Sequence, residues 1–193
     1  MQDSFYGMHW MLATPFDKSE GVDRSSIPRL VNKALEVGCC GVVALGVTGE
    51  AARLTDHERK VVAEIVVKAA GELPVTLGTT AASTHAAIMR AKEAQSLGAA
   101  AIMVAPPPMQ KPNLDILFAH YQRIADAVVL PIVVQDYPQA SGVQMPAAFI
   151  ARLADGIPTV RYLKLEDPPT PPKISAIRNL IGDRLGIFGG LGG

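Results

Sequence analysis

Short apolar segments alternate along the chain with longer segments in which apolar residues recur at helical spacing. The apolar segments have the length of β-strands, and the longer ones predict six intervening helices. Such an alternation predicts βα units and a parallel sheet. Because the strand segments are apolar throughout, we expect both faces of the sheet to be covered. The predicted strands lie at residues 7–16, 41–46, 74–79, 100–105, 131–137, 159–167 and 186–190.

Helix boundaries are marked by capping residues and prolines. Ser25 or Ser26 is the expected cap of the first helix, with a proline in its first turn. The segment TDHE at residues 55–58 has the pattern of a capping box, so the second helix is expected to begin there. The last helix is predicted from Lys173 to Ile181, after the proline-rich segment 168–172.

Two architectures share this pattern, an open doubly wound sheet and a (β/α)8 TIM barrel. No GxGxxG follows the first strand, which weakens the dinucleotide-binding version of the open sheet. Seven regular units favour the barrel, although a closed barrel needs an eighth strand. We therefore predict an α/β fold in which residues 1–193 form a single barrel domain of about seven βα units, incomplete at the C-terminus.

Composition excludes several classes of protein. Of the 193 residues, 49% are hydrophobic, enough for one sizeable core, and 18 basic residues balance 18 acidic ones. This balance gives no indication of nucleic acid or an anionic membrane surface as partner. We see no signal peptide or membrane span and expect reduced cysteines, so a cytoplasmic location is predicted. The four histidines are not spaced as metal ligands, and we predict neither metal nor cofactor.

The strand at 159–167 carries a lysine in its middle. Strand alternation places Lys164 and Glu166 on one face and Leu163 and Leu165 on the other. The leucines suit packing under helices, so Lys164 is expected to point into the barrel, near the strand end where barrel enzymes place their chemistry. The other lysines fall on loops or predicted helices, without a comparable setting.

A lysine in this position has two interpretations. Burial lowers the pKa of a lysine, and the neutral amine attacks carbonyl carbon to form a Schiff base. The protonated imine then accepts electrons from a bond that breaks beside it. Alternatively, Lys164 forms a buried ion pair with Glu166 or extends to the mouth of the barrel, with a purely structural role.

The stretch ALGVTGEAARLTDHER, residues 44–59, adds a second signal. It resembles the signature of the dihydrodipicolinate synthase / N-acetylneuraminate lyase family, and ATPFD at 13–17, DYP followed by SG, and the dipeptide at 163–164 continue the resemblance. The resemblance implies a (β/α)8 barrel, class I aldolase or lyase chemistry and Lys164 as the Schiff-base lysine. It also implies a longer chain with further C-terminal helices that forms a homo-oligomer, most often a homotetramer.

The resemblance implies a substrate site as well. Gly46 and Gly49 let the backbone turn tightly, and the N–H groups of this turn, together with the Thr48 hydroxyl, are expected to hold a carboxylate. Such a site selects 2-oxo acids. Gly190 resembles the residue whose backbone lies close to bound pyruvate. The predicted substrate-binding residues are Gly46, Val47, Thr48, Gly49, Gln135 and Gly190.

Four positions depart from the family pattern. Gln135 stands where the resemblance implies a proton-shuttling tyrosine, and Val47 where it implies a hydroxyl partner. A second relay tyrosine falls within the proline run 106–108, and Ala140 replaces an arginine that binds the second substrate. Glutamine and valine cannot act as general acid or base. These changes argue against dihydrodipicolinate synthesis itself.

We therefore predict a Schiff-base-forming lyase or aldolase that acts on pyruvate or a related 2-oxo acid, including a sugar-derived acid that loses water. Tyr137 and Glu166 are the candidate replacements for the lost acid–base groups. The alternative is a non-catalytic relative that binds a 2-oxo acid or serves in assembly. A phosphate-binding barrel is a weaker third possibility.

Overall fold

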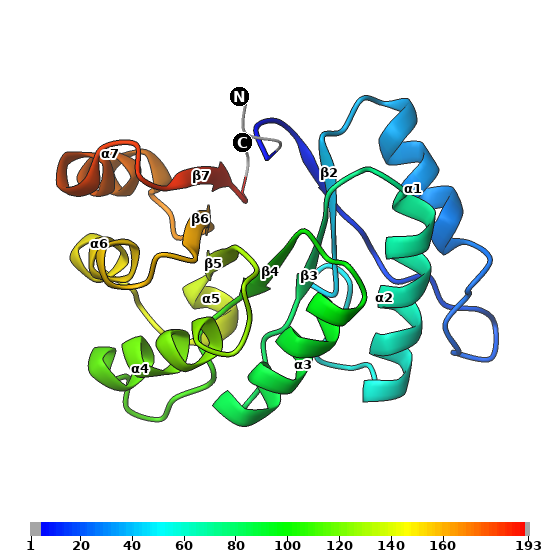
Figure 1. Ribbon diagram of the computed structural model, residues 1–193, viewed down its shortest axis with the longest axis horizontal. Coiled ribbons are helices and arrows are strands. Elements are labelled where there is room, and N and C mark those ends of the chain that lie inside the picture. Colours follow the sequence, from blue (N-terminus) through cyan, green and yellow to red (C-terminus); the bar gives the residue numbers. More distant parts are fainter. Residues whose placement is uncertain (1–4, 192–193) are drawn as a thin grey trace. The chain divides into compact units, whose positions relative to one another are not determined.

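The computed structural model describes residues 5–191 and contains strands that alternate with helices (Figure 1). In this part of the chain, no helix is long and apolar enough to cross a membrane. The strands are β1 His9–Met11, β2 Gly41–Ala44, β3 Val75–Gly78, β4 Ala101–Val104, β5 Ile132–Asp136, β6 Val160–Leu165 and β7 Gly186–Gly189. The helices are α1 Ile27–Glu36, α2 Asp56–Ala70, α3 Thr84–Ser96, α4 Leu114–Ala125, α5 Pro138–Ser141, α6 Ala147–Gly156 and α7 Thr170–Ile181.

The strands follow the order β1 to β7, as in the chain, which confirms the predicted alternation of strands and helices. The chain divides into two compact units, which are described separately below. The first comprises residues 5–79 and 93–102, and the second residues 80–92 and 103–191. Both α3 and β4 contribute residues to each unit.

In the first unit, β1, β2 and β3 pair in parallel, with His9 opposite Gly41 and Val42 opposite Val75. Every residue of β2 and β3 is buried, as their continuous apolar sequences predict. Helices α1 and α2 pack side by side next to this sheet (Figure 1). Val31 of α1 and Val66 of α2 belong to the core between these elements.

The two helices of the first unit begin differently. The predicted capping box of α2 is confirmed, because the Thr55 hydroxyl accepts the N–H of Glu58 while the Glu58 carboxylate accepts the N–H of Thr55. For α1, Ser26 occupies the predicted cap position, but it has helical backbone angles and makes no side-chain cap hydrogen bond. Instead the Asp23 carboxylate accepts the N–H groups of Ser25 and Ser26.

In the second unit, β5, β6 and β7 pair in parallel. Lys164 of β6 lies opposite Gln135 of β5 on one side and Phe188 of β7 on the other. Leu163 and Leu165 are fully buried, which fits the predicted packing of that strand face under helices. Helices α6 and α7 lie side by side (Figure 1), and α6 also contacts β6 and α4.

Two elements after β5 differ from the sequence prediction. The four-residue helix α5 was not predicted, because it is short and begins with a proline. Helix α7 begins at Thr170 instead of Lys173. Pro171 and Pro172 mark the first turn of this helix and not a loop, since a first-turn N–H needs no helical partner.

Candidate active site

Lys164 is the next-to-last residue of β6, and its ammonium is directed at a carboxylate. Its Nζ is 2.9 Å from Oε1 of Glu166, and the two side chains are only 11% and 6% exposed. The buried ion pair considered from the sequence is therefore present. This pair does not exclude Schiff-base chemistry, because a lysine must lose a proton before it attacks a carbonyl, and Glu166 is the nearest acceptor.

Gln135 completes this group from the neighbouring strand. Its side chain is buried, and its Nε2 donates a hydrogen bond to the second oxygen, Oε2, of Glu166 at 2.7 Å. The Glu166 N–H also donates to the backbone carbonyl of Asp136 at 2.8 Å, which extends the ladder beyond the end of β6. We call Gln135, Lys164 and Glu166 the Lys164 array. Both carboxylate oxygens are occupied, so the orientation of Glu166 is fixed.

Gly190 packs against the Lys164 array immediately after β7. Its N–H donates to the carbonyl of Leu165 at 2.9 Å. A Cβ atom built on Gly190 would lie 2.2 Å from Cγ and 2.7 Å from Cδ of Glu166. Only glycine therefore leaves room for the Glu166 side chain in its observed place. The predicted contact of Gly190 with substrate stays a prediction.

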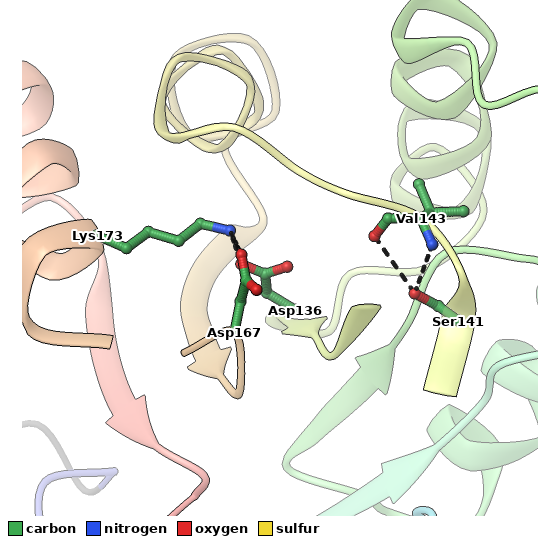
Figure 2. A network of polar contacts seen from close by, with 5 residues as sticks. All are labelled: Asp136, Ser141, Val143, Asp167 and Lys173. Carbon is green, nitrogen blue, oxygen red and sulfur yellow. Dashed lines mark hydrogen bonds and ion pairs between the residues drawn. The ribbon is translucent and has the colours of Figure 1, made fainter. Parts of the chain in front are cut away.

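A second buried lysine lies close to the ends of β5 and β6. Lys173 extends from the first turn of α7 to Asp136 and Asp167 (Figure 2), with Nζ–Oδ2 distances of 2.6 Å and 2.7 Å. Its side chain is 13% exposed and that of Asp136 is fully buried. The expectation that no other lysine has a setting comparable to Lys164 is therefore wrong. We call Asp136, Asp167 and Lys173 the Lys173 cluster.

The Lys173 cluster contains two carboxylates and one ammonium group. Burial raises the pKa of the Asp136 carboxyl, the Lys173 ammonium opposes this effect, and the neighbouring carboxylates of Asp167 and Glu166 reinforce it. Asp136 Oδ1 has no hydrogen-bond partner among residues 5–191. No local sequence signal marks this cluster, because its members lie on three different segments of the chain.

In the first unit, the predicted carboxylate-binding residues form a turn at residues 46–51 that follows β2. The buried hydroxyl of Thr14 donates to the Gly49 carbonyl at 2.6 Å. Gly49 lies close to backbone, since a Cβ there would be 3.1 Å from the Leu12 carbonyl oxygen. Buried Arg59 donates to the carbonyls of Ala51 at 2.9 Å and Gly78 at 2.7 Å, and so attaches the turn to α2 and β3.

The tip of the 46–51 turn presents polar groups to solvent. Val47 and Thr48 are exposed, and Gly46 is buried. None of the described residues accepts a hydrogen bond from the N–H groups of Val47, Thr48 or Gly49. Consecutive N–H groups of this kind suit an anion such as a carboxylate. Thr14 and Arg59 were not singled out from the sequence, although both lie within the segments that carry the family resemblance.

Residues 4–192 match the model of the dihydrodipicolinate synthetase family. The chain belongs to this family.

Two curated relatives have different activities. The chain is 35% identical over 180 residues to a 4-hydroxy-tetrahydrodipicolinate synthase of Thermomicrobium roseum, and the match covers 93% of the chain and 59% of the relative. It is also 35% identical over 184 residues to an L-2-keto-3-deoxyarabonate dehydratase of Azospirillum brasilense, again with 93% and 59% coverage. The chain thus spans about three fifths of the length of these dihydrodipicolinate synthetase family relatives.

A solved structure of the family confirms the predicted fold class. The dihydrodipicolinate synthase of Acinetobacter baumannii, complexed with pyruvate, matches with a TM-score of 0.89 and 33% identity over 94% of this chain and 62% of that one. The fold is therefore the α/β barrel of the family, with about seven βα units described. The two curated relatives named above are enzymes, a synthase and a dehydratase.

Of the two candidate acid–base residues, Tyr137 is not brought into the Lys164 array. β5 ends at Asp136, and Tyr137 is the residue that precedes α5, with φ −132° and ψ 77°. The strand alternation that placed it on the same face as Gln135 therefore does not extend to it. Its side chain is half-buried, and no described residue hydrogen-bonds to its hydroxyl. Its role in proton transfer stays a prediction.

The described residues contain no group of three or more histidine, cysteine, aspartate or glutamate side chains arranged to hold a metal ion. The cations nearest to the buried carboxylates of the second unit are the lysines themselves.

Proposed function

We propose that this protein is an imine-forming lyase that acts on a 2-oxo acid through Lys164, without a cofactor. The observation that carries the proposal is the buried contact of 2.9 Å between Lys164 Nζ and Glu166 Oε1. It pairs a nucleophile with a group that can take and return its proton. Membership of the dihydrodipicolinate synthetase family supports the same chemistry.

Imine formation follows from this pair. Glu166 accepts a proton from the Lys164 ammonium, and the neutral amine attacks the carbonyl carbon of the 2-oxo acid. Glu166 returns this proton to the carbonyl oxygen, then carries a second proton from the nitrogen of the adduct to the same oxygen, which leaves as water. An ammonium and a ketone thus become an iminium and water, and Glu166 is again a carboxylate. Gln135 Nε2, at 2.7 Å from Glu166, keeps the carboxylate oriented through these steps.

The iminium then directs the second half of the reaction. It acidifies the hydrogens on C3, next to the imine carbon, because the electron pair of a broken C–H bond is delocalised onto nitrogen. Glu166 is the proposed base for this proton. The resulting enamine expels a hydroxyl group from C4, which leaves as water after protonation, or forms a carbon–carbon bond at C3. Cleavage of a C3–C4 bond starts instead from the iminium, which accepts the electron pair of that bond.

We propose further that the substrate is not the pair used in dihydrodipicolinate synthesis. Gln135, Val47 and Ala140 lack the phenol, hydroxyl and guanidinium that the family resemblance implies for that reaction. The dehydratase of Azospirillum brasilense, at 35% identity, supports a sugar-derived 2-oxo acid that loses water. The structure of a synthase in complex with pyruvate supports a small 2-oxo acid as the common part of the substrate.

The 46–51 turn is the proposed site for the substrate carboxylate. The N–H groups of Val47, Thr48 and Gly49 donate no hydrogen bond to any described residue, and the Thr48 hydroxyl belongs to the same segment. Its action together with Lys164 is a prediction from the family resemblance. So are the homotetrameric assembly of the full-length protein and its cytoplasmic location.

Reductive trapping tests this proposal. Full-length protein is incubated with pyruvate or a 2-keto-3-deoxy sugar acid, reduced with borohydride and examined by mass spectrometry. We expect a substrate-sized adduct on the peptide that contains Lys164, absent in Lys164→Ala and present in the control Lys60→Ala, whose lysine is exposed on α2. No adduct with any 2-oxo acid tested contradicts the proposal.

Turnover assays separate the substrate classes. We expect loss of water from a 2-keto-3-deoxy acid, and no condensation of pyruvate with an aldehyde that bears a carboxylate. Efficient condensation would instead assign synthase activity to the protein.

The second candidate is a non-catalytic family relative that binds a 2-oxo acid. One observation favours it: both oxygens of Glu166 are already occupied, by Lys164 and Gln135. Saturable binding of pyruvate without an adduct or turnover would support this candidate.

A further inference from the structure

The Lys173 cluster joins the same two strand ends that carry the Lys164 array. Lys173 binds Asp136 at the end of β5 and Asp167 just after β6, at 2.6 Å and 2.7 Å (Figure 2). Asp136 directly follows Gln135, and Asp167 directly follows Glu166. Each carboxylate of the cluster is therefore one residue away from a member of the array.

A backbone hydrogen bond also links the Lys173 cluster to the Lys164 array. The Glu166 N–H donates to the Asp136 carbonyl at 2.8 Å, so the residue bound by Lys173 also holds the backbone of Glu166. In an extended segment, successive side chains point to opposite sides. Gln135 and Asp136 are successive residues of β5, so Lys173 contacts Asp136 on the strand face opposite to Gln135.

The position of Lys173 is not explained by helix formation. A cation near the start of α7 is unfavourable for the helix dipole, which favours acidic residues there. The prolines at 168, 169, 171 and 172 restrict the connection from β6 into the first turn of α7. A restricted segment that directs a lysine at two carboxylates is suited to hold them at a fixed separation.

We propose that Lys173 is a positioning residue, which keeps the Glu166 carboxylate within reach of Lys164 and Gln135 by fixing the ends of β5 and β6. This proposal rests on the proposed function of Lys164 and Glu166. Lys173 itself touches neither of these side chains in the contacts described, so its effect passes through Asp136 and Asp167.

The test uses full-length protein with Lys173→Met and Lys173→Arg. Methionine keeps most of the side-chain volume and removes the charge, whereas arginine keeps a cation that can bridge two carboxylates. The control is Lys33→Met, which removes an exposed ion pair to Glu36 of similar length, 3.0 Å. We expect Lys173→Met to lower kcat roughly 10- to 100-fold with little change in KM, as for a displaced catalytic group.

A double-mutant cycle separates positioning from general stability. If Lys173 acts through Glu166, Lys173→Met lowers kcat in the wild type but adds little in a Glu166→Gln background. Lys173→Arg recovers most of kcat, and Lys33→Met retains it. A loss of kcat that is equal in both backgrounds, or that simply follows the fraction of folded protein, overturns the proposal.

A crystal structure of the variant gives a readout that needs no activity. We expect the contacts of Glu166 with Lys164 and Gln135, now 2.9 Å and 2.7 Å, to be lost or lengthened in Lys173→Met. If Lys173→Met does not fold, Asp167→Asn loosens one side of the cluster and takes its place in both tests. If the contacts of Glu166 are unchanged in Lys173→Met, the positioning role is wrong, whatever the wild type does in reductive trapping. If the wild type forms no adduct in reductive trapping, only the proposed function is contradicted.

Discussion

At the scale of single residues, the site depends on how one carboxylate is shared. Glu166 accepts from Lys164 with one oxygen and from Gln135 with the other, and its Cγ faces Gly190. A buried carboxylate is stable only when such partners replace water. The same partners also fix its orientation, which a group that moves protons in several steps requires.

The first prediction concerns the acid–base group. Glu166→Gln keeps the shape of the side chain but cannot take a proton, so we expect kcat on the true substrate to fall roughly 10²–10⁴-fold. Tyr137→Phe is tested in parallel, because Tyr137 is the other candidate. Glu64→Gln on the exposed face of α2 serves as the control. If neither Glu166→Gln nor Tyr137→Phe changes kcat, neither residue has taken over proton transfer.

The second prediction concerns Gly190. A methyl group there would lie 2.2 Å from Glu166 Cγ, so Gly190→Ala must displace Glu166 or the segment after β7. We expect a fall in kcat of about 10²-fold, typical of a catalytic group displaced by an ångström. The control is Gly182→Ala, where a Cβ meets no atom within 4 Å, although its φ of +58° carries backbone strain. Full activity of Gly190→Ala would show that the contact with Glu166 is not needed.

The third prediction concerns pH and His120. Burial lowers the pKa of His120 to about 4, and the nearby Arg123 adds to the effect. Between pH 6.5 and 4 the unfolded chain therefore binds more protons at this site than the folded protein does, so the free energy of unfolding falls as the pH falls. The loss from this group approaches about 3 kcal/mol.

Urea unfolding at pH 7 and pH 4.5 measures this dependence. His120→Gln, which retains a hydrogen-bonding group for Thr84, should lose less stability between the two pH values than the wild type. The exposed His57→Gln should behave as the wild type. An equal loss in wild type and His120→Gln would show that His120 does not contribute.

Residue-level prediction from the sequence succeeded where the pattern was local. Alternation along 159–167 placed Lys164 and Glu166 on one face, and the structure brings their side chains together. The sequence did not predict the setting of Lys173, because this residue lies on α7 and its partner Asp136 lies on β5, 37 residues away in sequence. Gln135 was assigned from the resemblance, but its hydrogen bond to Glu166 could be seen only in the structure.

At the scale of elements, α2 positions the 46–51 turn through Arg59. The guanidinium is buried and donates to the carbonyls of Ala51 and Gly78. Arg59→Met would leave two backbone acceptors without this donor, and we expect a loss of roughly 2–3 kcal/mol in the free energy of unfolding. The control Arg53→Met removes only an exposed ion pair with Glu50, worth at most about 1 kcal/mol. Equal losses in urea unfolding of the two variants would contradict this role.

Element boundaries were predicted best where side chain and backbone interact within one turn. The capping box at 55–58 has this property and was confirmed. At the start of α1, Ser26 stands at the predicted cap position without a side-chain cap hydrogen bond, and the Asp23 carboxylate accepts the N–H groups of Ser25 and Ser26, which precede the helix. The start of α7 was placed too late, because prolines end helices from within but are tolerated in the first turn.

At the scale of the whole molecule, the alternation of strands and helices was sufficient to predict parallel βα units. The choice between an open sheet and a barrel came from the family resemblance and is confirmed by the structural match at a TM-score of 0.89. Hydrophobic pattern alone could not decide it, since strands covered on both faces have the same composition in both architectures.

The last prediction concerns residues 1–193 expressed by themselves. Strand β7 pairs with β6 on one side and stands last in the strand order, and its apolar residues Ile187 and Phe188 are only half-buried, unlike those of β5. An apolar strand that stands last in a sheet is a template for association with another copy. We therefore expect this segment to self-associate. Light scattering should show a broad mass distribution, and thermal unfolding should show no cooperative transition.

A charged residue on the edge opposes such pairing, so Phe188→Lys should narrow the mass distribution, whereas Leu180→Lys on the exposed face of α7 should not. A monodisperse, cooperatively melting monomer of residues 1–193 would contradict the prediction.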